Sequence, residues 1–313
     1  MTYAIDGELT PVLSLLPAID LRDAETARDT ERAILSDLPT PPIHDINFED
    51  RHVPGPDAAP DVSVRIYRPR QASGALPGIL KIHGGGFVTG GLDTDHAAAA
   101  VLASSLEAVV VSVDYRLAPE HPYPAAAEDC YAVLNWLAAS TDELAIDPTR
   151  TAVHGESAGG GLAAAVTLMA RDRSGPQLAF QFLSIPELDD RLETPSMLAY
   201  TDTPVWNRRN AEASWSAYLG GKAGSADVSA YAAPARADDL TSLPPAYVSV
   251  CHFDPLRDEG IEYARRLAHA NVPVDLHLYP GTFHGSAFVT SAAVSRRMHE
   301  DMLAAFQRAL TAH

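Results

Sequence analysis

A serine enclosed by glycines is the residue of this 313-residue chain whose surroundings best suit a nucleophile. Residues 151–166 read TAVHGESAGGGLAAAV, in which Gly155 and Gly159 stand two residues before and two residues after Ser157. The apolar residues before the serine are typical of a buried strand, and the small residues from Ala158 onward are typical of a helix. So sharp a turn strains the residue at its apex and leaves room only for neighbours without side chains. The pattern matches G-x-S-x-G and predicts a nucleophile elbow with the Ser157 hydroxyl at its tip.

A serine hydroxyl needs a base and an orienting acid before it can attack a carbonyl. Asp254, in CHFDPLRDEG, and His284, in YPGTFHGSAF, each come just after an apolar run typical of a strand. The carboxyl ends of parallel strands meet at one edge of a sheet, so these residues can converge on the serine. The chain order Ser, Asp, His therefore predicts a triad of Ser157, His284 and Asp254.

Other acids and histidines near these positions have simpler roles. Asp258 and Glu259 fall in the first turn of the helix expected after Asp254, where a carboxylate favours the positive end of the helix dipole. We expect His83 to hold the shape of the loop that it begins. His154 and His252 are expected to be buried histidines that point away from the site.

A tetrahedral intermediate also needs donors for its negative oxygen. The segment IHGGGF follows an expected strand, and its glycines allow backbone N–H groups to approach a substrate closely. We expect the N–H groups of Gly85, Gly86 and Ala158 to form the oxyanion hole.

Two nucleotide-binding interpretations of the glycine-rich segments fail. GESAGGG has Leu162 where a phosphate loop requires Ser or Thr, and Gly161 where it requires Lys. HGGGFVTGG has Thr89 in the place of the third glycine of a dinucleotide-binding fingerprint.

Composition limits the class of protein. Hydrophobic residues make up 46% of the chain and charged residues 20%, and no apolar run reaches the ~18 residues of a membrane span. The formal net charge of −18 disfavours nucleic acid and anionic membrane surfaces as partners. Cys130 and Cys251, the only cysteines, have no metal-binding spacing and suit core thiols in a reducing compartment. No cysteine or histidine spacing suits a metal, so we expect no metal site. The N-terminus lacks the basic start of a secretory signal, so we expect a cytoplasmic protein.

Expected strands alternate with expected helices, which predicts an α/β fold with a mostly parallel sheet covered by helices on both faces. The first strand alternates more than the others, as an antiparallel edge strand would. The expected strands are 62–67, 78–83, 108–114, 151–153, 178–184, 246–251 and 274–279. The expected helices are 94–106, 125–139, 158–171, 257–270 and 292–310.

Two segments do not follow this alternation. Residues 1–45 contain a helix-like stretch that ends in the Pro-rich segment 38–42, and residues at about 189–232 hold two of the three tryptophans. We expect both to form a cap over a catalytic domain of residues 46–313, because long excursions in compact domains are often functional; they could also be ordinary surface loops. Leu13, Leu16, Met197, Trp206 and Trp215 would face the elbow, although Trp206 and Trp215 suit helix packing equally well.

Several motifs together give the chain a family resemblance. HGGGF, VDYRLAPEHPYPAA, GESAGGG, DPLRDEG and FHG occur in the order found in the hormone-sensitive-lipase-like α/β-hydrolases, the bacterial family IV esterases, which the chain resembles from about residue 61 onward. Glu156 departs from the Asp of the commonest subgroup. Arg116 and Glu120, in the second motif, are expected to form a buried structural pair.

The resemblance implies a serine carboxylesterase for short- to medium-chain acyl esters, with an optimum near butyryl to hexanoyl, a helical cap, no cofactor and a possible homodimer. Amides, lactones or carbamates are alternative substrates. The gibberellin receptors of plants share this fold but lack the triad histidine, and His284 disfavours a receptor here.

Overall fold

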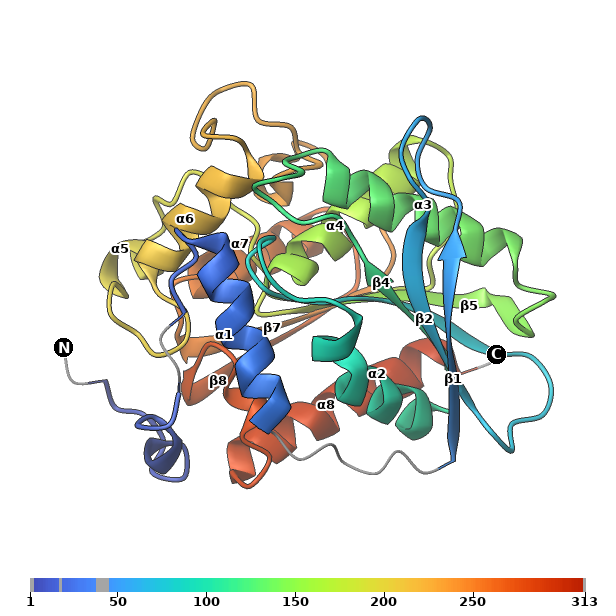
Figure 1. The fold of residues 1–313 in the computed structure, drawn as a ribbon, viewed down its shortest axis with the longest axis horizontal. Helices are drawn as coiled ribbons and strands as arrows, with labels where there is room; N and C mark the ends of the chain where they lie inside the picture. The colour runs from blue at the N-terminus through green and yellow to red at the C-terminus, as the bar shows by residue number, and fades with distance from the viewer. Residues whose placement is uncertain (1–2, 17–18, 38–44, 312–313) are drawn as a thin grey trace.

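Valine-rich strands place one sheet at the centre of the chain (Figure 1). The computed structural model describes residues 3–16, 19–37 and 45–311. Within these residues eight strands pair in the order β1-β2-β4-β3-β5-β6-β7-β8, parallel from β4 onward. The strands are β1 (Ile46–Val53), β2 (Val62–Pro69), β3 (Leu76–Ile82), β4 (Val109–Asp114), β5 (Ile146–Glu156), β6 (Phe180–Ser184), β7 (Ala246–Phe253) and β8 (Val274–Phe283).

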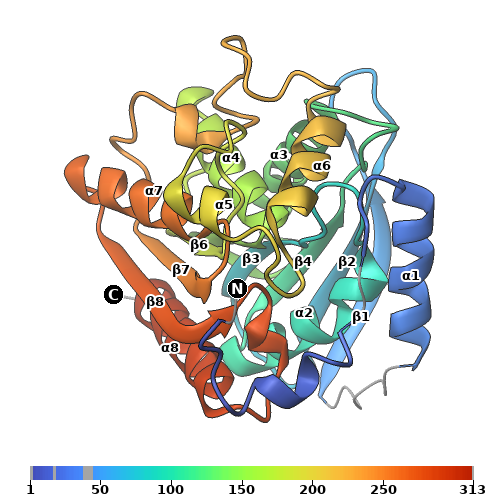
Figure 2. The same cartoon turned by 90° about the vertical axis from the view of Figure 1, so that its left-hand side faces the viewer.

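Helices cover both faces of the sheet, so the predicted α/β fold is confirmed (Figure 2). Most buried positions of β3 and β4 are apolar toward both faces, as parallel strands between two helix layers require. The exceptions are Lys81 of β3 and Ser112 of β4, which are buried and both bond to Asp95. One face carries α2 (Leu92–Leu106) and α8 (Ala293–Leu310), and the other carries α3 (Ala125–Ala139), α4 (Ala158–Asp172) and α7 (Arg257–His269). Short 3-10 helices occupy Thr10–Val12, Pro234–Arg236 and Ser286–Phe288.

The edge strand is not the predicted one. Strand β2 is antiparallel to both of its neighbours, but it lies inside the sheet, and β1 forms the edge. The sequence of β1, INFEDRHV, exposes most of its side chains, and only its first and last residues are buried. This strand was not predicted because its sequence contains no apolar run. Charged residues are typical of an exposed edge strand.

Strands β5, β7 and β8 extend farther than predicted, and each extension ends at the site. Strand β7 runs to Phe253, directly before Asp254. Strand β5 runs to Glu156, which pairs with Ser184 of β6, so Ser157 begins directly at the end of the strand. Strand β8 continues to Phe283, which places His284 at its carboxyl end.

Helices outside the sheet layers lie around the carboxyl ends of the strands (Figures 1 and 2). These are α1 (Ala24–Asp37), α5 (Pro195–Ala199) and α6 (Arg208–Tyr218). The Arg28 guanidinium of α1 donates to the carbonyls of Val88 and Ala118, and Arg209 of α6 pairs with Asp20 at 3.2 Å. The Pro-rich segment 38–42, expected to end the first helix, lies outside the described residues. None of the described helices has the length and apolarity that a membrane span requires.

Candidate active site

The turn between β5 and α4 has the strained geometry of a nucleophile elbow. Ser157 has φ of 55° and ψ of −121°, a conformation that a non-glycine residue rarely adopts. A Cβ at Gly155 would lie 2.0 Å from the carbonyl oxygen of Gly159, and a Cβ at Gly159 would lie 2.3 Å from that of Ile82. The chain can pack this closely only with glycine at both positions. The hydrogen bond from Ser157 N to Ser184 O, at 2.9 Å, holds the turn in place.

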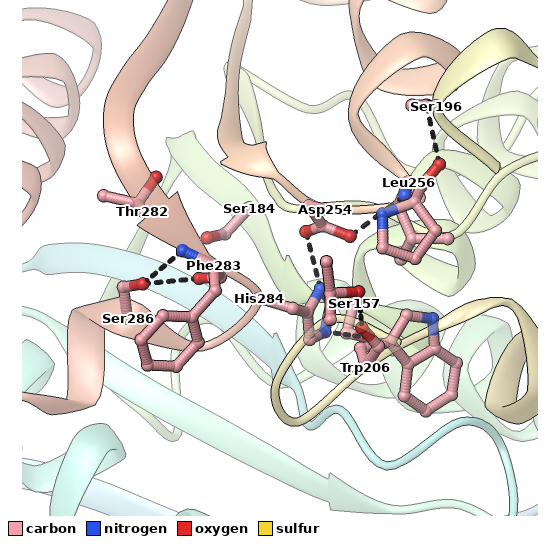
Figure 3. A network of polar contacts seen from close by, with 12 residues as sticks. Ser157, Ser184, Ser196, Trp206, Asp254, Leu256, Thr282, Phe283, His284 and Ser286 are labelled. Atoms are coloured by element: carbon pink, nitrogen blue, oxygen red, sulfur yellow. Dashed lines mark hydrogen bonds and ion pairs between the residues drawn. The ribbon is translucent and has the colours of Figure 1, made fainter. Parts of the chain in front are cut away.

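The three residues expected to form a triad lie in one hydrogen-bonded chain (Figure 3). The His284 Nε2 atom is 3.0 Å from Ser157 Oγ, and His284 Nδ1 is 2.7 Å from Asp254 Oδ2. The other Asp254 oxygen accepts a hydrogen bond from Leu256 N at 2.9 Å. Because a carboxylate only accepts, Nδ1 carries the proton and Nε2 presents its lone pair to the serine hydroxyl. All three side chains are buried.

The neighbouring acids Asp258 and Glu259 are engaged elsewhere. Both lie in the first turn of α7, as expected. Each accepts a hydrogen bond from a backbone N–H group, one before α5 and one in its first turn. Asp258 Oδ2 accepts from Ser196 N at 2.8 Å, and Glu259 Oε1 accepts from Leu188 N at 2.6 Å. These carboxylates anchor the segment of residues at about 189–232, called the insertion below, to α7.

Hydrogen bonds hold the carbonyl oxygens of the glycine-rich loop after β3. The donors are His83 Nδ1 to Gly84 O, the N–H groups of Val88 and Thr89 to Gly85 O, Ser214 Oγ to Gly86 O, and Ala118 N to Phe87 O. Gly85 and Gly86 have φ of 117° and 58°, which is left-handed backbone that favours glycine. The loop is therefore fixed in one conformation beside Ser157, which lines the same cavity.

A largely apolar cavity of about 370 Å³ lies over Ser157 and His284. The Trp206 ring forms part of its wall and stacks on His284 with 5.5 Å between ring centroids. Polar residues of the lining include Glu31, Thr89 and Asn210. The other large apolar lining residues come from the N-terminal segment, the insertion and the segments that follow β6 and β8: Ile19, Leu21, Ile34, Ile185, Val205 and Phe288.

Only one of the five apolar residues expected to face the elbow lines this cavity, namely Trp206. Trp215 is fully buried against Phe87, and Met197 is fully buried in the core. Leu13 and Leu16 line a separate hollow beside the insertion. The expectation was wrong for Leu13, Leu16 and Met197, whereas Trp215 has a packing role, the alternative left open for it. Each segment has an outer or core-facing side that the sequence does not distinguish from its cavity-facing side.

His83 and His154 have the structural roles expected of them, whereas His252, which was expected to be buried, is only half-buried. His83 stacks on Tyr115 with 4.2 Å between ring centroids, and burial lowers the pKa of its imidazole. His154 clusters with the rings of Phe182 and Phe306, and burial holds the pKa of its imidazole well below the usual range. His252 stacks on Phe253. Cys130 and Cys251 are buried free thiols, as predicted.

The predicted pair of Arg116 and Glu120 does not form. Arg116 instead makes a bidentate pair with the fully buried Asp129, at 2.7 and 2.9 Å. The exposed carboxylate of Glu120 pairs with Arg28 of α1 at 2.8 Å. The two true partners, Asp129 and Arg28, lie outside the quoted motif. The prediction was wrong because it paired two charges that are close in the sequence.

Sequence reasoning missed three polar residues behind the site. Glu31 of α1 accepts from Gly90 N at 2.9 Å, and burial raises the pKa of its carboxyl group. Ser214 of α6 contacts both Gly86 O and Glu187 Oε1. An acidic residue three positions after the strand end, in SIPELDD, is a weak signal for Glu187. No pattern distinguishes Ser214 from an ordinary helix serine.

Fold and site together define a class of protein. Residues 79–288 match the profile of a family described as having the alpha/beta hydrolase fold. The chain belongs to this family, and the resemblance to the hormone-sensitive-lipase-like branch is confirmed.

Particular relatives are similar over nearly the whole chain. Esterase LipI and carboxylesterase NlhH of Mycobacterium tuberculosis are each 41% identical to it, over 90% and 91% of this chain and 88% and 90% of theirs. The solved structure of a bacterial heroin esterase superposes with a TM-score of 0.95 at 48% identity and covers 99% of both chains. These relatives confirm the prediction of a carboxylesterase.

Proposed function

We propose that the protein hydrolyses short- to medium-chain acyl esters through an acyl-enzyme formed on Ser157. The observation that carries this proposal is the hydrogen-bonded chain from Ser157 through His284 to Asp254, beneath an apolar cavity. The activities named for the relatives point to the same bond.

In the first half-reaction, His284 Nε2 takes the proton from Ser157 Oγ as that oxygen attacks the ester carbonyl carbon. Asp254 keeps Nδ1 protonated and stabilises the imidazolium cation. The N–H groups of Gly85, Gly86 and Ala158 donate to the tetrahedral oxyanion, and the amino end of α4 adds its dipole. The imidazolium then returns its proton to the alcohol oxygen as the carbon–oxygen bond breaks.

In the second half-reaction, water attacks the acyl-enzyme. His284 takes a proton from the water, the oxyanion hole holds the second tetrahedral intermediate, and Ser157 Oγ leaves with the proton from His284. The products are an alcohol and a carboxylic acid.

We assign residues 1–45 and about 189–232 to a cap over a catalytic domain of residues 46–313. Leu21 and Trp206 support this assignment, because both contact the position that a Cβ of Gly86 would take, at 2.7 Å. The N-terminal segment and the insertion therefore meet over the glycine-rich loop. A homodimer and a cytoplasmic location stay predictions.

The acyl-chain dependence of hydrolysis tests this function. With p-nitrophenyl esters from acetyl to dodecanoyl, kcat/KM should rise roughly fourfold per methylene, from the ~0.8 kcal/mol that burial of each methylene contributes. It should fall once the chain outgrows the cavity, with an optimum near butyryl to hexanoyl. A preference for long-chain triglyceride emulsions would contradict the assignment.

Two matched tryptophan variants locate the acyl wall. Trp206→Phe should move the optimum toward longer chains, because the indole lines the cavity, whereas Trp215→Phe should leave the ratio between chain lengths unchanged. Equal shifts in both variants would show that Trp206 does not limit the acyl chain.

A further inference from the structure

One buried hydroxyl lies between an oxyanion-loop carbonyl and a buried acid. Ser214 Oγ of α6 is 3.1 Å from Gly86 O and 2.9 Å from Glu187 Oε1, and both side chains are fully buried. A hydroxyl has one hydrogen and can donate it to only one of these two oxygens. The Gly86 carbonyl can only accept. Two full hydrogen bonds form together when Glu187 carries a proton and donates it to Ser214, whereas with an ionised Glu187 the single Ser214 hydrogen must be shared between two acceptors.

The surroundings of Glu187 favour that proton. Burial raises the pKa of its carboxyl group to about 8, against a smaller lowering by the hydrogen bond with Ser214, and the charge of Asp254 acts in the same direction as burial. The titratable groups that face it are Asp254, Glu259 and Tyr218, none of which supplies positive charge. Its Oε2 atom has no hydrogen-bond partner in the described part of the chain. A neutral carboxylic acid is the form that this site tolerates at neutral pH.

The backbone of Glu187 lies directly behind the nucleophile elbow. Glu187 N donates to Ser157 O at 3.0 Å, and a Cβ at Gly161 would lie 2.1 Å from Glu187 O. Glu187 is thus fixed by the elbow, while Ser214 comes from the insertion and Gly86 from the glycine-rich loop. The hydrogen bonds join all three elements at one point.

We propose that Glu187 and Ser214 are positioning residues for the oxyanion hole: the neutral acid donates to Ser214, and Ser214 donates to the Gly86 carbonyl and fixes the loop. This role rests on the esterase function proposed above. When Glu187 ionises, its carboxylate competes for the single Ser214 hydrogen. The Gly86 carbonyl then loses its donor, and the loop loses the orientation in which its N–H groups meet the oxyanion.

The consequence is an alkaline limit on the rate. As pH rises past about 8, kcat should fall by five- to twentyfold, below the 10²- to 10³-fold typical when one oxyanion-hole donor is removed. The KM should change less, because the ester in its ground state depends little on the hole.

The test is the pH profile of kcat and KM for p-nitrophenyl butyrate, with Ser157→Ala subtracted as the blank. Glu187→Gln should keep the rise on the acid side and lose the alkaline fall, because an amide can donate to Ser214 at every pH. Ser214→Ala should lower kcat about tenfold and should also lack the alkaline fall. Glu259→Gln is the matched control, since Glu259 is equally buried and its pKa is also raised, and it should keep the alkaline fall.

An alkaline fall that persists in both Glu187→Gln and Ser214→Ala would overturn the proposal, as would its loss in Glu259→Gln. If Glu187→Gln does not fold, as judged by thermal unfolding, the Ser214→Ala profile decides. A wild-type protein without ester hydrolysis would refute the proposed function instead, so the two failures are distinguishable.

Discussion

Ser157→Ala should lower kcat for p-nitrophenyl butyrate by about 10⁴- to 10⁶-fold while the protein stays folded. The substitution removes the oxygen that His284 Nε2 contacts at 3.0 Å, so no acyl-enzyme can form. Alanine fits the space that serine leaves, and the backbone bond from residue 157 N to Ser184 O can remain. Thermal unfolding by circular dichroism measures the fold, and initial rates measure the loss.

A second buried serine provides the control. Ser249 of β7 is 4% exposed and donates its hydroxyl to Ser184 Oγ at 3.3 Å. Ser249→Ala should keep activity within a few-fold of the wild type. Near-normal turnover by Ser157→Ala would refute the mechanism.

Asp254→Asn should lower kcat by about 10⁴-fold. The amide cannot neutralise the imidazolium, and an N–H directed at His284 Nδ1 would force the proton onto Nε2, where it blocks the serine. The pocket should hold the asparagine, because Leu256 N can still donate to its side-chain oxygen, as it does to Asp254 Oδ1. Rates and unfolding curves of the two proteins test this expectation.

Asp258→Asn is the matched control for Asp254→Asn. Its carboxylate accepts from Ser196 N and pairs with Arg257, so its loss should affect stability more than turnover. A 10⁴-fold loss in Asp258→Asn, with little loss in Asp254→Asn, would show that Asp258 and not Asp254 is the acid of the triad.

Much of the fold follows from strong local patterns. Strand β4 and helix α3 have nearly the predicted bounds. The valine run of β4 is typical of a buried strand, and the apolar residues of α3 recur at helical spacing, so each pattern favours one type of element. Strand β1 was not predicted, because its exposed charged residues leave no alternation of apolar and polar residues in its sequence. The ends of β5 and β8 were underestimated, since pairing with neighbouring strands extends them beyond their apolar runs.

The positions of Ser157, Asp254 and His284 were predictable because backbone geometry dictates the residues around them. Gly155 and Gly159 are required by contacts of 2.0 and 2.3 Å, and the strand ends determine where the acid and the base lie. The cavity wall and the Glu187–Ser214 contact were not predictable in the same way. They depend on how the insertion folds back over the glycine-rich loop, and no local spacing encodes that approach.

Arg116 illustrates the same limit in a motif that was recognised. Arg116 lies in the loop after β4, and its partner Asp129 lies in the next helix, α3. The pair holds this loop against the helix. Proximity in sequence suggested Glu120, which instead binds the N-terminal helix through Arg28. Pairing of charges across elements requires the three-dimensional arrangement.

Covalent labelling tests the central claim, that Ser157 is the nucleophile. The wild-type protein and Ser157→Ala would be treated with a fluorophosphonate probe, digested, and mapped by tandem mass spectrometry. The account predicts one phosphonylated site at Ser157 in the wild type, formed in parallel with the loss of esterase activity, and no labelling of the variant. A modification at any other residue that tracks the loss of activity would contradict it.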